Sequence, residues 1–306
     1  MSKLQLNRLG IEAWHELESE LGGDLPVRWG GSVEWYGEPA AAAEFRADIR
    51  RHQSWGYATH LIDQGTLTSL EPHVTPGAVT VAAHAQLEGH VDPVLATQLL
   101  LERARVAGAR VLHPAEVTGL DEARGRLRAV RTSAGPVEAD VLVIACGTDT
   151  PRVAAMAGIR VPLQHSPGIL VHTAPMPSLL ERVVLAPTGH MKQKPDGRIL
   201  VGQSFGGTPG TDTSPELARQ ALERAADALP QLRTARVDRV TLGWRPLPID
   251  GFPIAGFAPG RPDVYVTVMH SGVTLSPAIA LFAAVEILDR VDAEPLAPYR
   301  PARFQA

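Results

Sequence analysis

The residues best suited to chemistry lie near the C-terminus of the sequence. Arg245 lies in a Pro- and Gly-rich turn segment, Gly243–Gly256, which is followed by the β-branched strand pattern Val264–Val268. The run His270–Pro277 then places Gly272 where a turn opens directly into a helix. A helix start carries unpaired amide donors and a positive dipole end, and an arginine fork suits a carboxylate. These segments together could hold the negatively polarised edge of a cofactor against a substrate anion.

A glycine motif that usually accompanies such a site is absent. The sequence has 28 glycines, yet no two of them are separated by a single residue. The G-x-G-x-x-G turn that binds a dinucleotide pyrophosphate therefore does not occur in this chain. The reactive end of a cofactor site is present without its phosphate anchor.

Composition is that of an ordinary enzyme. With 306 residues, 44% hydrophobic and 20% charged, the chain can build a large core and about two domains. A net charge of −4 with no basic block argues against a nucleic-acid partner. Apolar runs such as Val273–Leu288 are interrupted by polar residues, so we expect no membrane span, and with no apolar signal core at the start we expect a cytoplasmic protein. The single cysteine, Cys146, excludes an internal disulfide, and we expect a small buried side chain there, the alternative being a position close to a cofactor.

Helix and strand patterns alternate in the middle of the chain. Asp92 followed by Pro93 and, later, Gly108 predicts a capped helix. Strands are expected at 110–113 and 116–120, followed by a hairpin that turns at Ala134 and Gly135. The continuous apolar run Val141–Ala145 predicts a strand buried on both faces.

Two β-rich blocks flank this part. Helical spacing predicts a helix over residues 4–21, stopped by Gly22 and Gly23, and another helix at 214–229. Short strand patterns recur at 33–36, 59–62, 78–82, 169–172 and 198–202. The interleaving predicts two spatial domains, each built from discontinuous sequence.

Six short motifs in this order resemble the D-amino-acid oxidase family of FAD-dependent amine oxidoreductases, which includes glycine oxidase, sarcosine oxidase and opine and hydroxyproline dehydrogenase subunits. The motifs occupy Leu87–Pro93, Ala139–Gly147, Pro195–Gly202, Gly243–Ile254, His270–Pro277 and Pro298–Phe304. The resemblance implies an α/β fold, α+β overall, with an incomplete Rossmann-like dinucleotide-binding domain and a substrate domain with a mixed, largely antiparallel sheet. It places the FAD-binding domain at 85–164 and 243–306 and the substrate domain mainly at 1–84 and 165–242.

The resemblance also implies roles for residues near the flavin. Backbone amides of Gly272, Val273, Thr274 and Leu275 would face the flavin's pyrimidine edge, where helix-start donors favour negative charge. Arg245 would hold the substrate carboxylate, the alternative being a structural salt bridge. A plain turn–helix junction is the alternative for Gly272.

Other contacts implied by the resemblance are less specific. Val117 would lie along the adenine, and Ala145 and Gly147 would pass close to the pyrophosphate. His270 and His190 are candidates for substrate contact, with a structural histidine as the alternative for each. His84 and His90 have no carboxylate or second histidine at ligand spacing beside them, so they give no case for a metal site.

The resemblance implies FAD-dependent oxidation of the C–N bond of an amino or imino acid to an imine. The family's first strand, glycine-rich turn and helix have no counterpart in this sequence, so we expect an N-terminally truncated chain. The alternatives are a chain completed by a partner subunit, and a degenerate, non-catalytic member. A nicotinamide-dependent dehydrogenase would need the same absent glycine turn and gives the Arg245 turn no role. The implied partners are a small amino or imino acid and an electron acceptor.

Overall fold

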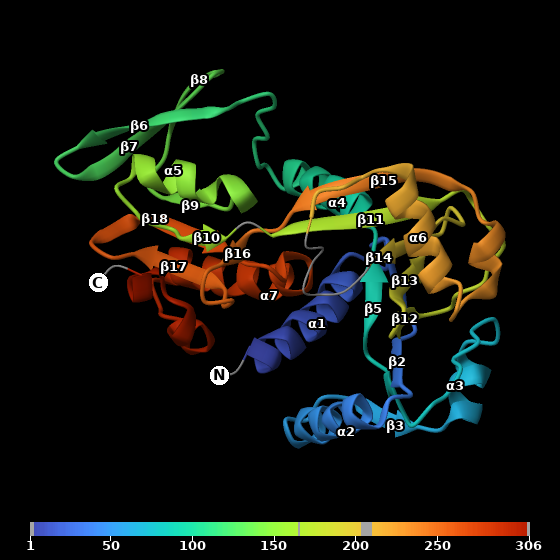
Figure 1. Cartoon of the computed structure of the whole chain (residues 1–306). Helices are drawn as coiled ribbons and strands as arrows, with labels where there is room; N and C mark the ends of the chain where they lie inside the picture. The colour runs from blue at the N-terminus through green and yellow to red at the C-terminus, as the bar shows by residue number, and fades with distance from the viewer. Residues whose placement is uncertain (1–2, 165, 203–209, 305–306) are drawn as a thin grey trace. The chain divides into compact units, whose positions relative to one another are not determined.

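The computed structural model describes residues 3–164, 166–202 and 210–304. Its contacts divide the chain into two compact units, each formed from separate stretches of sequence (Figure 1). Unit 1 comprises residues 1–24, 97–166 and 244–306, and unit 2 comprises residues 25–96 and 167–243. The N-terminal segment 1–24 thus belongs with unit 1, whereas the sequence pattern grouped it with residues 25–84. Residues 203–209, inside the expected substrate part, lie outside the described residues.

Unit 2 is built on an eight-stranded mixed sheet with strand order β15-β11-β14-β13-β12-β2-β4-β3. Strands β12 and β2 pair in parallel, whereas the other pairs with a described register are antiparallel. A separate two-stranded ribbon joins β1 to β5. The strands of unit 2 are β1 (Val27–Trp29), β2 (Ser32–Tyr36), β3 (Thr59–Ile62), β4 (Val81–Ala85), β5 (Gly89–Val91), β11 (Pro167–Thr173), β12 (Val183–Ala186), β13 (Gly189–Gln193), β14 (Ile199–Gly202) and β15 (Val237–Trp244).

Among the described residues, three α-helices lie wholly within this unit, and each begins where the sequence provides a cap. They are α2 (Pro39–Ser54), α3 (Gln64–Leu70) and α6 (Pro215–Ala225). A short 3-10 helix, η2 (Pro230–Thr234), follows the last of them. The Ser214 hydroxyl accepts from the Leu217 amide at 3.2 Å and so caps α6. Alanines and leucines of α6 then pack on the inward side chains of β11, β13 and β14, and α6 lies along these strands in Figure 1. One face of the sheet is thereby buried in the main core of unit 2.

Unit 1 holds smaller sheets: β17-β18-β9, the meander β6-β7-β8 and the pair β10-β16. The strands are β6 (Val117–Ala123), β7 (Arg126–Thr132), β8 (Gly135–Glu138), β9 (Leu142–Ile144), β10 (Leu163–Gln164), β16 (Leu247–Pro248), β17 (Ile254–Ala258) and β18 (Arg261–Val268). The helices are α1 (Lys3–Glu20), α5 (Thr150–Met156) and α7 (Gly272–Ala284), with short turns η1 (Gly147–Asp149), η3 (Val285–Asp289), η4 (Glu294–Tyr299) and η5 (Pro301–Phe304). Helix α4 (Pro93–Val106) starts in unit 2 and continues into unit 1.

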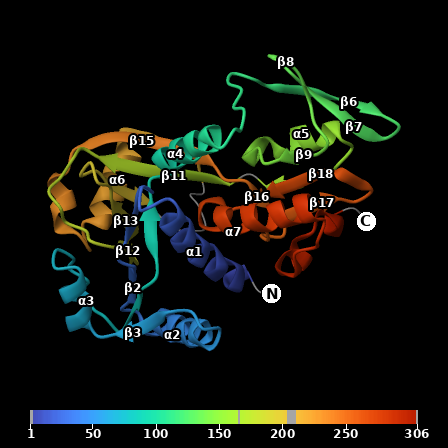
Figure 2. The ribbon, with the colours of Figure 1, turned by 180° about the vertical axis from the view of Figure 1, so that it is seen from behind.

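Helix α1 packs along α7, and the two run side by side in both views (Figures 1 and 2). Leu6 of α1 and Leu275 and Ile279 of α7 form one apolar cluster. Helix α7 begins four residues after the end of the buried strand β18. Its first turn is therefore held both by β18 and by its packing against α1.

The structure confirms the expected α/β fold with a mixed, largely antiparallel sheet, and it corrects three details. Residues 110–113 form no strand. The run Val141–Ala145 is not a strand buried on both faces, because only Leu142–Ile144 is extended and Val143 is 45% exposed. Cys146 is exposed and not a core residue. The apolar run is long enough for a central strand, but β9 has a described strand neighbour on one side only, β18.

Candidate active site

Arg245 and His270 lie together in unit 1. Arg245 directly follows β15, and its amide donates to the Ser166 carbonyl at 2.9 Å, which fixes the turn. The Arg245 Nη1 atom lies 3.4 Å from His270 Nε2. Arginine carries only donors, so in this contact Nε2 is the acceptor and the imidazole is neutral. The sequence predicted both residues as site candidates, and the structure brings them into contact.

The start of α7 comes two residues after His270. Ser271 gives no side-chain cap, and the first helical bond runs from the Leu275 amide to the Ser271 carbonyl at 2.9 Å. Amides in the first turn of a helix have no partner within the helix and carry the positive dipole end. Val273 is 50% exposed, whereas Leu275 is fully buried in the core of unit 1. Of the four residues assigned to the flavin edge, Leu275 has its side chain buried in the core and its amide already bonded to Ser271, and its contact with a flavin stays a prediction.

Helix α1 holds this helix start in place, which the sequence analysis did not anticipate. The Trp14 indole Nε1 donates to the Val273 carbonyl at 2.9 Å. A Cβ at Gly10 would lie 2.4 Å from the Thr274 carbonyl oxygen, so only glycine permits this approach. The available signal was a glycine on the apolar face of a predicted helix, which often indicates close packing of two backbones.

Asp250 supports the turn that follows Arg245, as its Asp-Gly sequence predicted. Its carboxylate accepts from the Phe252 amide at 3.0 Å and from Arg303 Nε at 2.7 Å. Burial alone would raise the pKa of Asp250, but the hydrogen bonds from Arg303 and Phe252 hold it below its usual value. A carboxylate that stays charged in this way fixes the turn and performs no proton transfer.

The residues expected near the pyrophosphate and adenine lie at the ends of other strands in unit 1. Gly147 has φ of 58°, a left-handed conformation that favours glycine, and Ala145 is exposed two residues earlier. Val117 begins β6, and its carbonyl accepts from Arg152 Nη1 at 3.2 Å. Their contact with a cofactor stays a prediction.

His190 belongs to unit 2, so it is described with that unit. It lies on β13 opposite Leu185 of β12 and Gly202 of β14. Burial lowers the pKa of His190, which favours the neutral imidazole. Its role in substrate contact stays a prediction.

The residues of unit 1 fit the flavin end of an FAD molecule. No heavy atom lies within 4 Å of the position that a Cβ would take at Gly147 or Gly272, so a ligand can approach the backbone at both places. The α7 start would hold the pyrimidine edge, where a dipole end stabilises negative charge. Among the described residues no group of three or more His, Cys, Asp or Glu side chains could hold a metal ion.

One described helix, over Gly272–Asp289, has the length and apolar composition that a membrane crossing needs. Core helices meet the same criterion. Leu275, Ala278, Ile279 and Ala283 are buried in unit 1, and Glu286 forms an ion pair there with Arg300.

Comparison with known proteins shows the class to which this fold belongs. A family model described as DAO, FAD dependent oxidoreductase, matches residues 1–285. The chain belongs to this family of FAD-dependent oxidoreductases.

Two curated relatives are similar over most of this chain. Hydrogen cyanide synthase subunit HcnC of Pseudomonas aeruginosa is 30% identical over 260 residues, covering 80% of this chain and 60% of the relative. Glycine oxidase of Geobacillus kaustophilus is 28% identical over 276 residues, covering 86% of this chain and 72% of the relative. The chain thus aligns with about three fifths of the first relative and somewhat more of the second.

Solved structures show the same fold. L-proline dehydrogenase from P. horikoshii superposes with a TM-score of 0.88 at 22% identity, covering 98% of this chain and 83% of that structure. Glycine oxidase from Geobacillus kaustophilus has a TM-score of 0.84 at 24% identity, covering 98% and 82%.

Proposed function

We propose that this chain takes part in the FAD-dependent oxidation of the C–N bond of a small amino or imino acid to an imine. Family membership and the names of its relatives, glycine oxidase and L-proline dehydrogenase, support an amino-acid substrate. The observation that carries the proposal is the Arg245–His270 contact two residues before the α7 start.

Each of these groups has a defined task. Arg245 binds the substrate carboxylate, because its planar fork offers parallel donors that a carboxylate can accept together. Neutral His270 accepts from one Nη atom and orients the fork. A bound FAD would supply the hydride acceptor for the carbon that bears nitrogen. The α7 start favours the negative charge that accompanies this transfer, and the amine binds unprotonated, so no general base is required.

Substitution of Arg245 tests the carboxylate assignment. With FAD added, we expect Arg245→Ala to lower kcat/KM for carboxylated substrates about 10- to 100-fold, mainly through KM, because a charged hydrogen bond is lost. Steady-state kinetics with an amino acid and with an amine that lacks the carboxylate show whether the loss depends on the carboxylate. The kcat/KM for the amine should change little.

An exposed arginine provides the control. Arg233 pairs with Asp227 on the surface of unit 2, and Arg233→Ala should leave both substrates unaffected. Equal kinetics of Arg245→Ala and the unchanged protein toward the amino acid would remove Arg245 from the site.

A partner chain is the second candidate arrangement. HcnC and an opine oxidase relative from Agrobacterium tumefaciens are both named as subunits. Strand β9 has one described strand neighbour and carries the exposed Val143, so a further strand could pair there. Addition of a partner that completes the sheet should raise FAD affinity, which absorbance titration measures. Unchanged affinity would argue for the isolated chain as the functional unit.

A further inference from the structure

Unit 2 contains a cavity of about 260 Å³ beside the face of the sheet opposite α6. Strands β11, β13, β14 and β15 supply one wall, and the β1–β5 ribbon with the start of α4 supplies the other. Aliphatic side chains line much of it: Val27, Val91, Val94, Leu170 and Leu200. None of the residues assigned above to the flavin or the substrate lines this cavity.

Positive charge exceeds negative charge in the cavity wall. Arg28, Lys192, Lys194 and Arg239 line it, with Asp92 as the carboxylate among the lining residues. Asp92 pairs with Lys194 at 2.8 Å, and Arg28 pairs with Glu181 outside the lining at 2.6 Å.

The unbalanced cations are therefore Lys192 and Arg239. Lys192 Nζ donates to the Val91 carbonyl at 3.2 Å, and among the described residues no carboxylate forms an ion pair with Lys192 or Arg239. Lys192 is half-buried, and burial lowers its pKa. The charge of Asp92 acts on Lys192 in the opposite direction, but its close ion pair is with Lys194. A partly desolvated cation attracts an anion more strongly than one in water.

Neighbouring cations also lower the pKa of two histidines, His90 and His172, in addition to the larger effect of burial. Burial, together with the neighbouring charges of Lys192 and Arg28, lowers the pKa of His90 to about 4. Burial also lowers the pKa of His172, as does the charge of Arg239. The His172 ring is 7% exposed, and its Nδ1 atom has no hydrogen-bond partner among the described residues. Both rings line the cavity.

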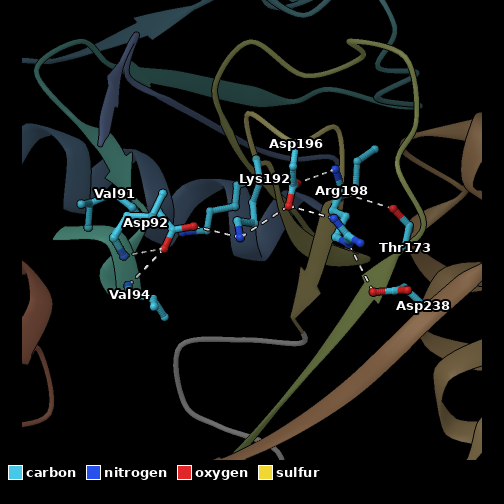
Figure 3. Close-up of polar contacts among 11 residues, drawn as sticks. Val91, Asp92, Val94, Thr173, Lys192, Asp196, Arg198 and Asp238 are labelled. Atoms are coloured by element: carbon cyan, nitrogen blue, oxygen red, sulfur yellow. Dashed lines mark hydrogen bonds and ion pairs between the residues drawn. The ribbon is translucent and has the colours of Figure 1, made fainter. Parts of the chain in front are cut away.

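Polar contacts connect the segment that follows β13 to the start of α4 and to β15 (Figure 3). The Asp92 carboxylate accepts from the Val94 and Leu95 amides at the start of α4 at 3.1 and 3.2 Å, as well as from Lys194. The network continues through Asp196 and Arg198 to Asp238 on β15. Lysine use is selective: the chain has three lysines, and two of them, Lys192 and Lys194, line this cavity.

From this geometry we propose that the cavity binds a small carboxylate with an aliphatic chain. Lys192 and Arg239 bind the carboxylate, and the aliphatic wall of Val27, Leu170 and Leu200 contacts the chain. A cavity with apolar walls and a few convergent charges is the usual form of a small-molecule site. The lining of this cavity includes none of the residues assigned to the proposed oxidation.

Calorimetric titration of the purified 306-residue chain tests the proposal, with butanoate as the probe and butanamide as its uncharged analogue. Butanoate should bind, and butanamide should bind at least about tenfold more weakly because it lacks the charge. Lys192→Met and Arg239→Gln should each weaken butanoate about tenfold or more. Equal binding of the two probes, or no binding of butanoate, would overturn the proposal, as would preferential binding of inorganic phosphate.

Three further variants assign the binding to this cavity. Arg245→Ala should retain butanoate binding, which separates this site from the substrate site in unit 1. Arg233→Gln, outside the cavity, should also retain it. Arg239 is exposed, so Arg239→Gln keeps the fold even if the buried substitution at Lys192 does not. Loss of binding in Arg245→Ala with retention in Arg239→Gln would locate the anion elsewhere and overturn the proposal.

Discussion

Glu286 is the most deeply buried charged residue of the C-terminal segment, and every hydrogen bond it accepts comes from unit 1. Arg300 contacts both carboxylate oxygens, at 2.5 and 2.7 Å, and the Tyr265 hydroxyl and the Ala293 amide each donate at 2.8 Å. Burial alone would raise the pKa of Glu286, but these donors outweigh it and hold the pKa below its ordinary value of 4.5. The charge is therefore part of the folded core.

Loss of the Arg300 partner should be costly for this reason. We expect Arg300→Met to lower the free energy of unfolding by about 3 kcal/mol at neutral pH, because a buried carboxylate loses its counter-ion. Urea unfolding measures it. Arg233→Met, which breaks an exposed pair with Asp227, should cost no more than about 1 kcal/mol.

The difference in free energy of unfolding between Arg300→Met and the unchanged protein should change with pH in one direction. A carboxyl whose pKa is lowered on folding stabilises the folded state above its ordinary pKa and loses that contribution as the pH falls. In Arg300→Met, the Arg300 hydrogen bonds no longer offset the effect of burial on the pKa of Glu286. The Glu286 carboxylate of the folded protein therefore accepts a proton at a higher pH. The stability gap between the two proteins should therefore narrow from about pH 7 to about pH 4. A gap that widens would contradict this account of Glu286.

Candidate site residues could be identified from sequence where they stand out by residue type, and their roles stay predictions. Arg245 and His270 stand out by type and spacing, and the structure places them in contact. Glu286, by contrast, reads in sequence as a charge interrupting an apolar run, because its partners lie on other elements. Cys146 was wrongly expected in the core, since a strand pattern cannot reveal whether a neighbour covers both sides of the strand.

At the scale of elements, the contact of α1 with α7 is the one that positions the proposed flavin edge. Gly10 lets the α1 backbone approach the Thr274 carbonyl, and Trp14 donates to the Val273 carbonyl one residue earlier. These carbonyls belong to the first turn of α7. A helix formed of residues far from α7 in sequence therefore sets the direction of the amides that we propose to face the flavin.

Gly10→Ala tests this packing. Alanine normally favours a helix by up to about 1 kcal/mol over glycine, yet here we expect a loss of about 1 to 3 kcal/mol, because the added methyl group meets backbone that cannot move aside. Chemical denaturation measures it. Gly65 in α3 has only the Asp63 side chain within 4 Å, and Gly65→Ala should be neutral or stabilising. A stabilised Gly10→Ala protein would mean that the two helices separate at little cost.

Most elements could be predicted from sequence because their signals are local. The caps of α4 and α6 and the two glycines after α1 gave helix bounds close to those observed. Residues 110–113 were wrongly expected as a strand, since β-branched residues favour extended structure only where a neighbouring strand is available. Strand pairing, including the parallel β2–β12 pair, depends on contacts between residues far apart in the sequence and was not predictable.

At the scale of the whole molecule, the two units divide the proposed functions. Unit 1 carries Arg245, His270 and the α7 start, and unit 2 carries the β13 strand with His190 and the cationic cavity. The sequence predicted two discontinuous units because its β-rich and α/β blocks alternate. It grouped the N-terminal helix differently, because helical periodicity identifies an apolar face but does not show which element packs against it.

The absence of a G-x-G-x-x-G turn has a measurable consequence for flavin selectivity. In our proposal the α7 start contacts the flavin end of the cofactor, and the expected contacts of Ala145, Gly147 and Val117 with the rest of it use backbone only. A dedicated pyrophosphate turn does not occur in this sequence. We therefore expect the isolated chain to bind FAD and riboflavin with affinities within about tenfold of each other. Fluorescence titration with both ligands measures this. FAD binding about a hundredfold tighter than riboflavin would show that other residues grip the phosphates.

The exposed Cys146 next to Gly147 has a practical meaning for such measurements. It is the chain's single thiol, and it lies on the surface of unit 1 immediately before the glycine expected to approach the pyrophosphate. A fluorophore attached there labels one known position without any engineered cysteine, and its emission reports events at that strand end directly. The native sequence thus offers a single labelling site at the strand end where the cofactor phosphates are expected.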